Sequence, residues 1–352
     1  GWSPWSVGVS PSNQDVCYGA GTRNLGTVDG GVQWQQIVSD NLPDGSSATR
    51  GTEGTTTYGM HFDPFDDQHL FISYTDLGAY HSFNGGKSWF HSIKGIPREW
   101  INTCYWMEFD PKVEGLLWGA WSNVHDLPRA KMYRSGNLVN GRKKGGVAVS
   151  HDSGRTWEKS TSGIPDETVC THIVLDKNSP ADSRTLYVCG YGSGVFKSTD
   201  GGNSWSSADN GLGANRNAWR ITLLPSGTLY LIMARGYEDG QIVDGALFRS
   251  DDGASNWSPV ALPQGVNAPN DLVFDPSNPR RMYLSCWPSE RQKNERHGGL
   301  LRTEDSGESW ERVFDDAAYV YGAAVHPDKP STVFIATFES AVFRSDDRGT
   351  SW

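Results

Sequence analysis

An eight-residue motif recurs seven times along this 352-residue chain and constrains its fold more than any other feature. The pattern is Ser/Thr-x-Asp-x-Gly-x-x-Trp, and the segment from Ser198 to Trp205 matches it at every position. Two copies depart from it, because Asn84 replaces the Asp and Ala254 replaces the Gly. We call these segments the repeat turns. They begin at Thr27, Ser82, Ser150, Ser198, Ser250, Thr303 and Ser345.

The residue types of the motif predict a tight turn between two antiparallel strands. The Asp carboxylate can accept hydrogen bonds from backbone N–H groups across the turn. Gly supplies a backbone conformation that other side chains disfavour. The Trp opens the next strand with a large apolar anchor. Seven such turns therefore indicate seven similar structural units.

The spacing of the repeat turns predicts the architecture. Successive turns begin 55, 68, 48, 52, 53 and 42 residues apart, which is the period of four-stranded propeller blades. A content of 41 Gly residues suits many short strands joined by turns. We predict an all-β, seven-bladed β-propeller that spans residues 1–352 as a single domain. Each repeat turn is expected between the third and fourth strands of its blade.

The ends and the composition bound the remaining properties. The chain stops at Trp352, directly after the last repeat turn, so the last blade is expected to lack its fourth strand and the natural protein is expected to continue. No apolar run is long enough for a membrane span. A net charge of −10 does not favour nucleic acid as a partner. The start of the chain already reads as folded protein, and we expect a secreted or periplasmic location.

The cysteines indicate neither a metal site nor a disulfide framework. Their number is five and none has Cys-x-x-Cys spacing, so buried free thiols are the favoured interpretation. A disulfide between Cys170 and Cys189, which flank one expected hairpin, stays open. No cofactor is expected.

Loops on one face of the propeller are the expected location of a functional site. The loops between second and third strands share a face with the crossovers between blades, and the repeat turns lie on the other face. We also expect the Asp-Pro turns between first and second strands to lie on a different face from the repeat turns. The repeat-turn carboxylates are therefore scaffold, and the variable loops carry the candidate residues.

Aromatic and basic side chains on these loops suggest a carbohydrate groove. Sugar C–H faces stack on exposed aromatic rings, while the hydroxyls need polar partners. Packing between blades is the alternative for each Trp. The candidate substrate-binding residues are Trp100, Trp121, Arg129, Trp219, Arg220, Tyr237, Trp287 and Arg291.

The repeat turns resemble the Asp-box, or bacterial neuraminidase repeat, of sialidases, sortilin-type receptors and glycoside hydrolase family 74. The segment Tyr58 to Tyr80 of the second unit, with Thr75-Asp76-Leu77-Gly78-Ala79-Tyr80, resembles the first blade of family 74 xyloglucanases. The resemblance implies that Asp76 is a catalytic carboxylate. One Gly of the family's Gly-Gly pair is absent here. The family also places its cleft between two propellers, so an additional domain is possible in the full-length protein.

Three functions remain open from the sequence. An inverting glycosidase needs two carboxylates about 6.5–9.5 Å apart, for which we select Asp76 and Asp126, with Glu238 as a substitute. A lyase of uronate-containing glycans needs a His or Tyr base, such as His125, beside Arg side chains. Adjacent residues tend to point apart, so His125 and Asp126 are not expected to pair. A glycan- or protein-binding propeller without catalysis is the third possibility, and a glycoside hydrolase acting on a polysaccharide or oligosaccharide is favoured.

Overall fold

The described residues form mainly short antiparallel strands, and a single-turn helix, η1 (Arg98–Trp100), precedes the third repeat. The computed structural model describes residues 4–10, 13, 15–21, 25–36, 39–49, 55–129, 132, 138, 142–238, 241–289, 298–316, 319–338 and 342–352. Within these ranges, no helix has the length and apolar character that crossing a membrane would require.

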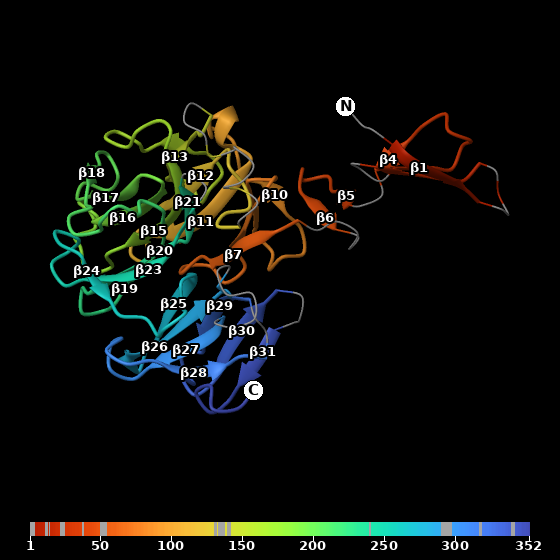
Figure 1. Cartoon of the computed structure of the whole chain (residues 1–352). Coiled ribbons are helices and arrows are strands. Elements are labelled where there is room, and N and C mark those ends of the chain that lie inside the picture. The colour runs from red at the N-terminus through yellow and green to blue at the C-terminus, as the bar shows by residue number, and fades with distance from the viewer. Residues whose placement is uncertain are drawn as a thin grey trace.

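Six consecutive sheets stand around a common axis as the blades of a β-propeller (Figure 1). We number them 2 to 7 after the repeat that each contains. Blade 2 consists of β7 (Thr57–Phe62), β8 (Leu70–Tyr74), β9 (Ala79–Ser82) and β10 (Phe90–His91). Blade 3 consists of β11 (Thr103–Phe109), β12 (Leu117–Ser122), β13 (Gly145–Ser150) and β14 (Glu158–Lys159). Blade 4 consists of β15 (Val169–Leu175), β16 (Leu186–Tyr191), β17 (Gly194–Ser198) and β18 (Ser206–Ser207).

The other three blades follow the same order, with one hairpin inserted. Blade 5 carries the hairpin β21 (Gly236–Glu238) and β22 (Gln241–Val243) between its second and third strands. Blade 5 consists of β19 (Ala218–Leu223), β20 (Leu229–Met233), β23 (Ala246–Ser250) and β24 (Ser258–Val260). Blade 6 consists of β25 (Pro269–Asp275), β26 (Asn278–Cys286), β27 (Gly299–Thr303) and β28 (Glu311–Phe314). Blade 7 consists of β29 (Val320–Val325), β30 (Val333–Thr337) and β31 (Val342–Ser345).

The first repeat is not a blade of this ring. Its strands form a separate sheet, which we call the N-terminal sheet, of β1 (Pro4–Val9), β2 (Cys17–Gly21), β3 (Leu25–Thr27) and β4 (Gln35–Gln36). The hairpin of β5 (Ser39–Asn41) and β6 (Ser47–Thr49) follows it, and the N-terminal sheet lies away from the ring (Figure 1). The prediction of seven blades is therefore wrong for the ring, which has six. A repeat specifies the four strands of one sheet, whereas docking that sheet depends on contacts with other repeats.

The repeat turns are held by their own side chains. In blade 4, Asp200 Oδ1 accepts hydrogen bonds from Ser198 Oγ at 2.7 Å and from the Ser204 amide at 2.9 Å. The amide of Gly201 donates to the carbonyl of Arg184, in the connection between the first two strands, at 2.9 Å. Both connections thus lie on one face, and the expectation of different faces is wrong. In an up-and-down sheet, the first and third connections emerge at the same end.

The Trp of a repeat turn ties its blade to the preceding blade. Trp205 donates its indole N–H to the carbonyl of Ser160 at 2.8 Å and its amide to the carbonyl of Ser162 at 2.8 Å. Gly163 adopts a φ of +94° here, and a Cβ at this position would lie 2.0 Å from the Trp205 carbonyl oxygen. Three other repeat-turn tryptophans also donate their indole N–H to the blade before their own. They are Trp157, Trp257 and Trp352.

The core lies between neighbouring blades, so interior blades are buried on both faces. Every residue of β12, β16 and β20, the second strands of blades 3, 4 and 5, is buried. In the second strands of blades 2 and 7, β8 and β30, buried residues interchange with more exposed ones. All five cysteines are free thiols, so Cys170 and Cys189 are not joined.

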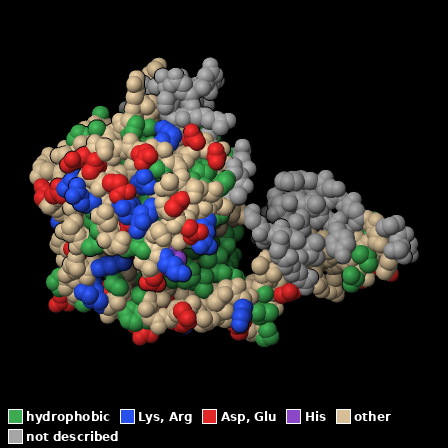
Figure 2. Space-filling model, turned by 90° about the horizontal axis from the view of Figure 1, so that it is seen from below, with side chains coloured by type: hydrophobic (Ala, Val, Ile, Leu, Met, Phe, Trp, Pro, Cys, Tyr) green, Lys and Arg blue, Asp and Glu red, His purple; other side chains and the backbone are tan. Residues whose placement is uncertain are grey.

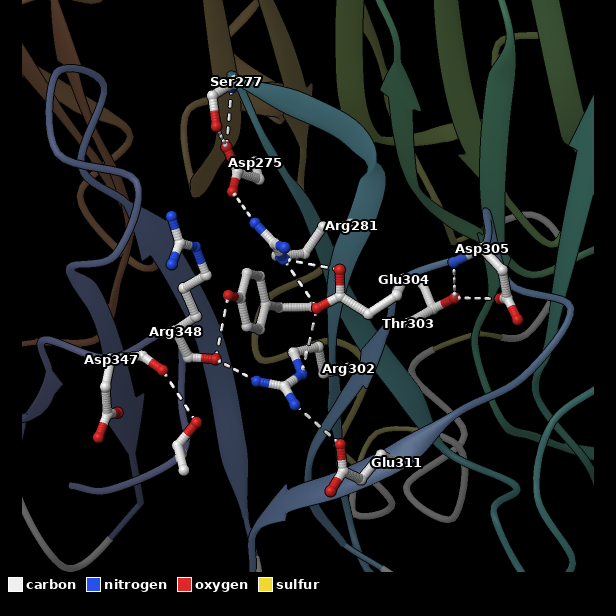
Figure 3. Close-up of polar contacts among 12 residues, drawn as sticks. Asp275, Ser277, Arg281, Arg302, Thr303, Glu304, Asp305, Glu311, Asp347 and Arg348 are labelled. Carbon is white, nitrogen blue, oxygen red and sulfur yellow. Dashed lines mark hydrogen bonds and ion pairs between the residues drawn. The ribbon is translucent and has the colours of Figure 1, made fainter.

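Ion pairs join the strands of blade 6, and a hydrogen bond connects this blade to blade 7 (Figure 3). Arg281 on β26 contacts Asp275 through Nη1 and Glu304 through Nε, both at 2.8 Å. Arg302 on β27 donates to the carbonyl of Arg348, in the last repeat turn, at 2.8 Å. Elsewhere the surface is mixed in charge, with Lys and Arg interspersed among Asp and Glu over the visible face of the ring (Figure 2).

Candidate functional site at the propeller axis

Each innermost strand of the ring shifts its pairing register once near its start. A residue at such a bulge has no partner across the ladder, so its side chain is free to be re-aimed. The innermost strands begin at the end of the axis opposite the repeat turns. The six bulged residues are Tyr58, Tyr105, Thr171, Trp219, Asn270 and Tyr321.

Hydrogen bonds connect the bulges from blade 4 to blade 7. Thr171 Oγ1 donates to the carbonyl of Trp219 at 3.1 Å, and Trp219 Nε1 donates to the carbonyl of Asn270 at 2.9 Å. Asn270 Nδ2 then donates to the carbonyl of Tyr321 at 2.5 Å. These side chains fix the spacing of four blades at this end of the axis.

The loop that follows β12 is anchored to the same end by two tyrosines. Tyr105 donates its hydroxyl to the carbonyl of Val124 at 2.9 Å, and Tyr58 donates to the carbonyl of Leu127 at 3.3 Å. The two tyrosine rings lie 4.6 Å apart between centroids. Burial raises the pKa of both hydroxyls above the ordinary value, so both stay protonated at neutral pH.

His125 and Asp126 pair near the start of this loop. His125 Nδ1 lies 3.1 Å from Asp126 Oδ2, so the expectation that these neighbours point apart is wrong. Asp126 adopts a φ of +58°, so this segment is not an extended strand, in which neighbouring side chains would point to opposite sides. Asp126 is buried, whereas about a third of the His125 side chain, 35%, is exposed.

Two arginines from the predicted set lie at the axis. Arg129 Nε donates to the hydroxyl of Tyr321 at 3.3 Å, which links the loop of blade 3 to blade 7. Arg220 lies in β19 and not in a crossover loop as predicted. Its guanidinium lies 4.4 Å from the Trp219 ring centroid, and its Nη1 donates to the Thr171 carbonyl at 2.7 Å. The structure therefore brings Asp126, His125, Arg129, Trp219 and Arg220 to one end of the axis.

The four tryptophans selected as sugar-stacking platforms are buried. Trp121, for example, lies inside β12 and packs edge-on against Trp157 at 5.7 Å between ring centroids. Their burial corresponds to the alternative of packing between blades, and it argues against a stacking role for all four. These residues are Trp100, Trp121, Trp219 and Trp287.

Asp76 belongs to blade 2, the blade before the one whose loop carries Asp126. It is exposed in the turn between β8 and β9, where it adopts a φ of +64°. Asn102, at the entry to blade 3, donates its Nδ2 to Asp76 Oδ1 at 3.3 Å. The Gly78 amide also donates to the Asn102 carbonyl at 3.3 Å. The turn is thus held against the next blade while its carboxylate faces solvent.

The remaining predicted residues belong to the loops of blades 5 and 6. Tyr237 is half-buried in β21. The side chain of Glu238 and the whole of Arg291 lie outside the described part of the chain. Among the described residues, no group of three or more His, Cys, Asp or Glu side chains could hold a metal ion.

Glu108, two residues after Trp106 on β11, gives a testable pH dependence. Desolvation raises its pKa to about 7, with Lys177 opposing the shift. The folded state therefore holds a proton that the unfolded chain releases near 4.5, and stability falls as pH rises from about 4.5 to 7. For the wild type, we expect the free energy of unfolding to be about 1–3 kcal/mol lower at pH 8 than at pH 5. Glu108→Gln should remove this difference, as measured by urea unfolding at the two pH values. The matched variant of the exposed Glu114, Glu114→Gln, should keep the wild-type fall, and equal profiles for all three proteins would contradict the assignment.

Known proteins resemble this chain in sequence and in fold. No model of a protein family matches it. A xyloglucanase of Paenibacillus sp is 24% identical over 342 residues, which cover 86% of this chain and 31% of that protein. A xyloglucanase of Hypocrea jecorina is 23% identical over 324 residues, which cover 79% of this chain and 36% of that protein. The resemblance to xyloglucanases seen in the second repeat therefore extends over most of the chain.

The solved structures support the propeller fold. The family 74 xyloglucanase of Xanthomonas campestris superposes with a TM-score of 0.62 at 16% identity, covering 99% of this chain and 54% of that one. YCF48 bound to a D1 peptide superposes with a TM-score of 0.52 at 15% identity, covering 98% and 97%. This chain spans about a third of the curated relatives, 31% and 36%. It is an all-β propeller.

Proposed function

We propose that this protein is a glycoside hydrolase that acts on a polysaccharide or oligosaccharide outside the cytoplasm. The observation that carries the proposal is the position of Asp76. Its carboxylate is exposed, and its turn is fixed by a positive φ and by Asn102. It lies on the propeller face opposite the repeat turns, and the resemblance of residues 58–80 to family 74 implies the role of a catalytic carboxylate. The long alignments with two xyloglucanases support the same reading.

The proposed mechanism uses two carboxylates. One protonates the departing sugar oxygen, and the other activates water on the opposite face of the ring, which inverts the anomeric centre. We assign Asp76 to one role and Asp126 to the other. A second carboxylate from an additional domain is the alternative, since the chain spans about a third of the matched xyloglucanases.

The axial cluster does not favour a lyase that uses a tyrosine base. Proton abstraction beside a uronate carboxylate needs a base whose pKa lies near the working pH. Tyr58 and Tyr105 have pKa values above the ordinary tyrosine value, because burial disfavours their charged forms. His125, paired with Asp126, is a candidate base for that reaction.

A product assay on a panel of polysaccharides tests the proposed function. The panel contains xyloglucan and a uronate-containing glycan, and each digest is measured for new reducing ends and for absorbance of unsaturated uronate. We expect new reducing ends without that absorbance. Absorbance that rises with the reducing ends would identify a lyase, and no new ends on any substrate would refute both enzymes and leave the binding propeller.

A further inference from the structure

The junction between blades 2 and 7 is the open place in the ring. Along the ring from β7 to β29, each innermost strand packs on the next, whereas β29 and β7 do not pack extensively on each other in the described part of the chain. In Figure 1 these two blades spread apart on the side where the chain leaves toward the N-terminal sheet. The six-bladed ring is therefore open at one junction.

Blade 2 presents an apolar face at this junction. Residues directly paired across antiparallel strands share a face, so Met60, Ile72 and Tyr80 lie together. Met60 is 50% exposed and Phe62, two residues further along β7, is 65% exposed. The opposite face carries Phe71, which is fully buried against blade 3.

Blade 7 presents a second face that is apolar apart from Arg344, which pairs with Phe334. Ala324 pairs with Phe334, and Ala336 pairs with Val342, so these four side chains share a face. Val342 is 69% exposed. Figure 2 shows a hydrophobic region on the side of the ring toward the N-terminal sheet. Two apolar faces of this kind flanking one gap mark a docking surface.

Trp34 of the N-terminal sheet differs from four other repeat-turn tryptophans in the indole hydrogen bond that it makes. In blades 3, 4, 5 and 7 the indole N–H reaches the residue three places after the Trp of the preceding repeat turn: Ser92, Ser160, Ala208 and Val313. Trp34 instead donates to its own turn, at Gly31, and is 38% exposed. Trp89 exchanges backbone hydrogen bonds with Ser47 in the β5–β6 hairpin.

We infer that the gap between blades 2 and 7 is the docking site of the N-terminal sheet of the same chain. The sheet has the strand order and the repeat turn of a blade. Docking covers the apolar face of blade 2 with one side of the sheet and that of blade 7 with the other. Trp89 then pairs with Ser39, five residues after Trp34, because Trp157, Trp205 and Trp257 pair with the residue at that spacing.

The tether favours the sheet of the same chain over that of a second copy. Twenty residues separate Gln36 from Thr57, and a short linker gives an effective concentration of order millimolar. Docking of this sheet would also make residues 1–352 one body. A docked and an undocked arrangement then differ by the exposure of these two faces.

Solution scattering with hydrogen exchange tests the inference. A compact chain of 352 residues has a radius of gyration of about 20 Å, and we expect the wild type to be a monomer of this size. Phe62→Asp places a charge on the docking face and should enlarge the molecule, with exchange in β3 and β4 roughly tenfold faster. Phe65→Asp alters an exposed aromatic in the β7–β8 connection and should change neither quantity.

A second variant keeps the test valid if Phe62→Asp disturbs the ring itself. Trp34→Ala lies outside the ring and should release the sheet in the same way. A wild type that is already extended would overturn the inference, as would variants that match the wild type in size and exchange. A dimer that separates at low concentration would assign the gap to a second copy and would overturn it as well.

Discussion

Asp76→Asn should lower the rate of polysaccharide hydrolysis by about 10²–10⁴-fold, the contribution of a positioned acid or base. The amide is nearly the same size and its oxygen can still accept the hydrogen bond from Asn102. Because the side chain is exposed, the free energy of unfolding should stay near the wild-type value. The loss should therefore fall on kcat and not on folding. The measurement is the initial rate of reducing-end release on the best substrate of the panel.

Asp67→Asn is the matched control for this experiment. Asp67 is an exposed carboxylate of the same blade, in the connection between β7 and β8 on the face of the repeat turns. Its replacement should leave the rate unchanged. Full activity of Asp76→Asn would show that this residue is not the catalytic carboxylate, while an inactive wild type would refute the hydrolase itself. Asp126→Asn tests whether the second carboxylate comes from this chain or from an additional domain. If Asp126 is the second carboxylate, its replacement should lower the rate about as much as Asp76→Asn does. If an additional domain supplies it, the rate should not fall in this way.

Arg184→Met should lower the free energy of unfolding by about 3–5 kcal/mol, the effect of removing one partner of a buried ion pair. Arg184 and Asp110 are both almost fully buried, and two hydrogen bonds of 2.6 Å join them between the turns of blades 4 and 3. Arg184 Nη1 also donates to the Ser179 carbonyl at 2.5 Å. The substitution strands the Asp110 carboxylate in the interior. Urea unfolding at pH 7 measures the effect.

The pH dependence of this loss checks its cause. Burial alone would raise the pKa of Asp110, but Arg184 and two backbone amides outweigh it and hold the pKa below the ordinary 3.8. A depressed carboxyl pKa contributes stability above the unfolded value, and this is lost as pH falls through the folded value. The gap between wild type and Arg184→Met should therefore narrow below about pH 4. Adding Asp110→Asn should recover part of the stability at pH 7, and a loss below about 1 kcal/mol would contradict the assignment.

The sequence predicted the propeller from the spacing of a turn, because that turn depends on local chemistry. Ser198, Asp200 and Ser204 form their hydrogen bonds within seven residues. The number of blades in the ring could not be predicted in this way. It depends on whether a sheet such as β1 to β4 finds apolar faces on its neighbours, which is a property of the assembled ring.

The candidate site was only partly predictable. Asp126, Arg129 and Arg220 were selected from the sequence and lie at the axis, but the bulges that gather them were not anticipated. A one-residue register shift leaves no mark in composition, although an alignment of the repeats places Tyr58, Tyr105 and Tyr321 at equivalent positions. The burial of Trp121 was missed for a related reason, since the sequence does not show that β12 is enclosed on both faces.

The direction of the tryptophan contacts has a consequence for synthesis on the ribosome. Trp157, Trp205 and Trp257 each reach backward to the blade made before their own. A blade therefore receives the hydrogen bond from the next repeat-turn Trp only after that repeat has been synthesised. By the spacing of the turns, this is about 50 residues later. During synthesis from the N-terminus, each nascent blade therefore lacks this contact until the next repeat has emerged.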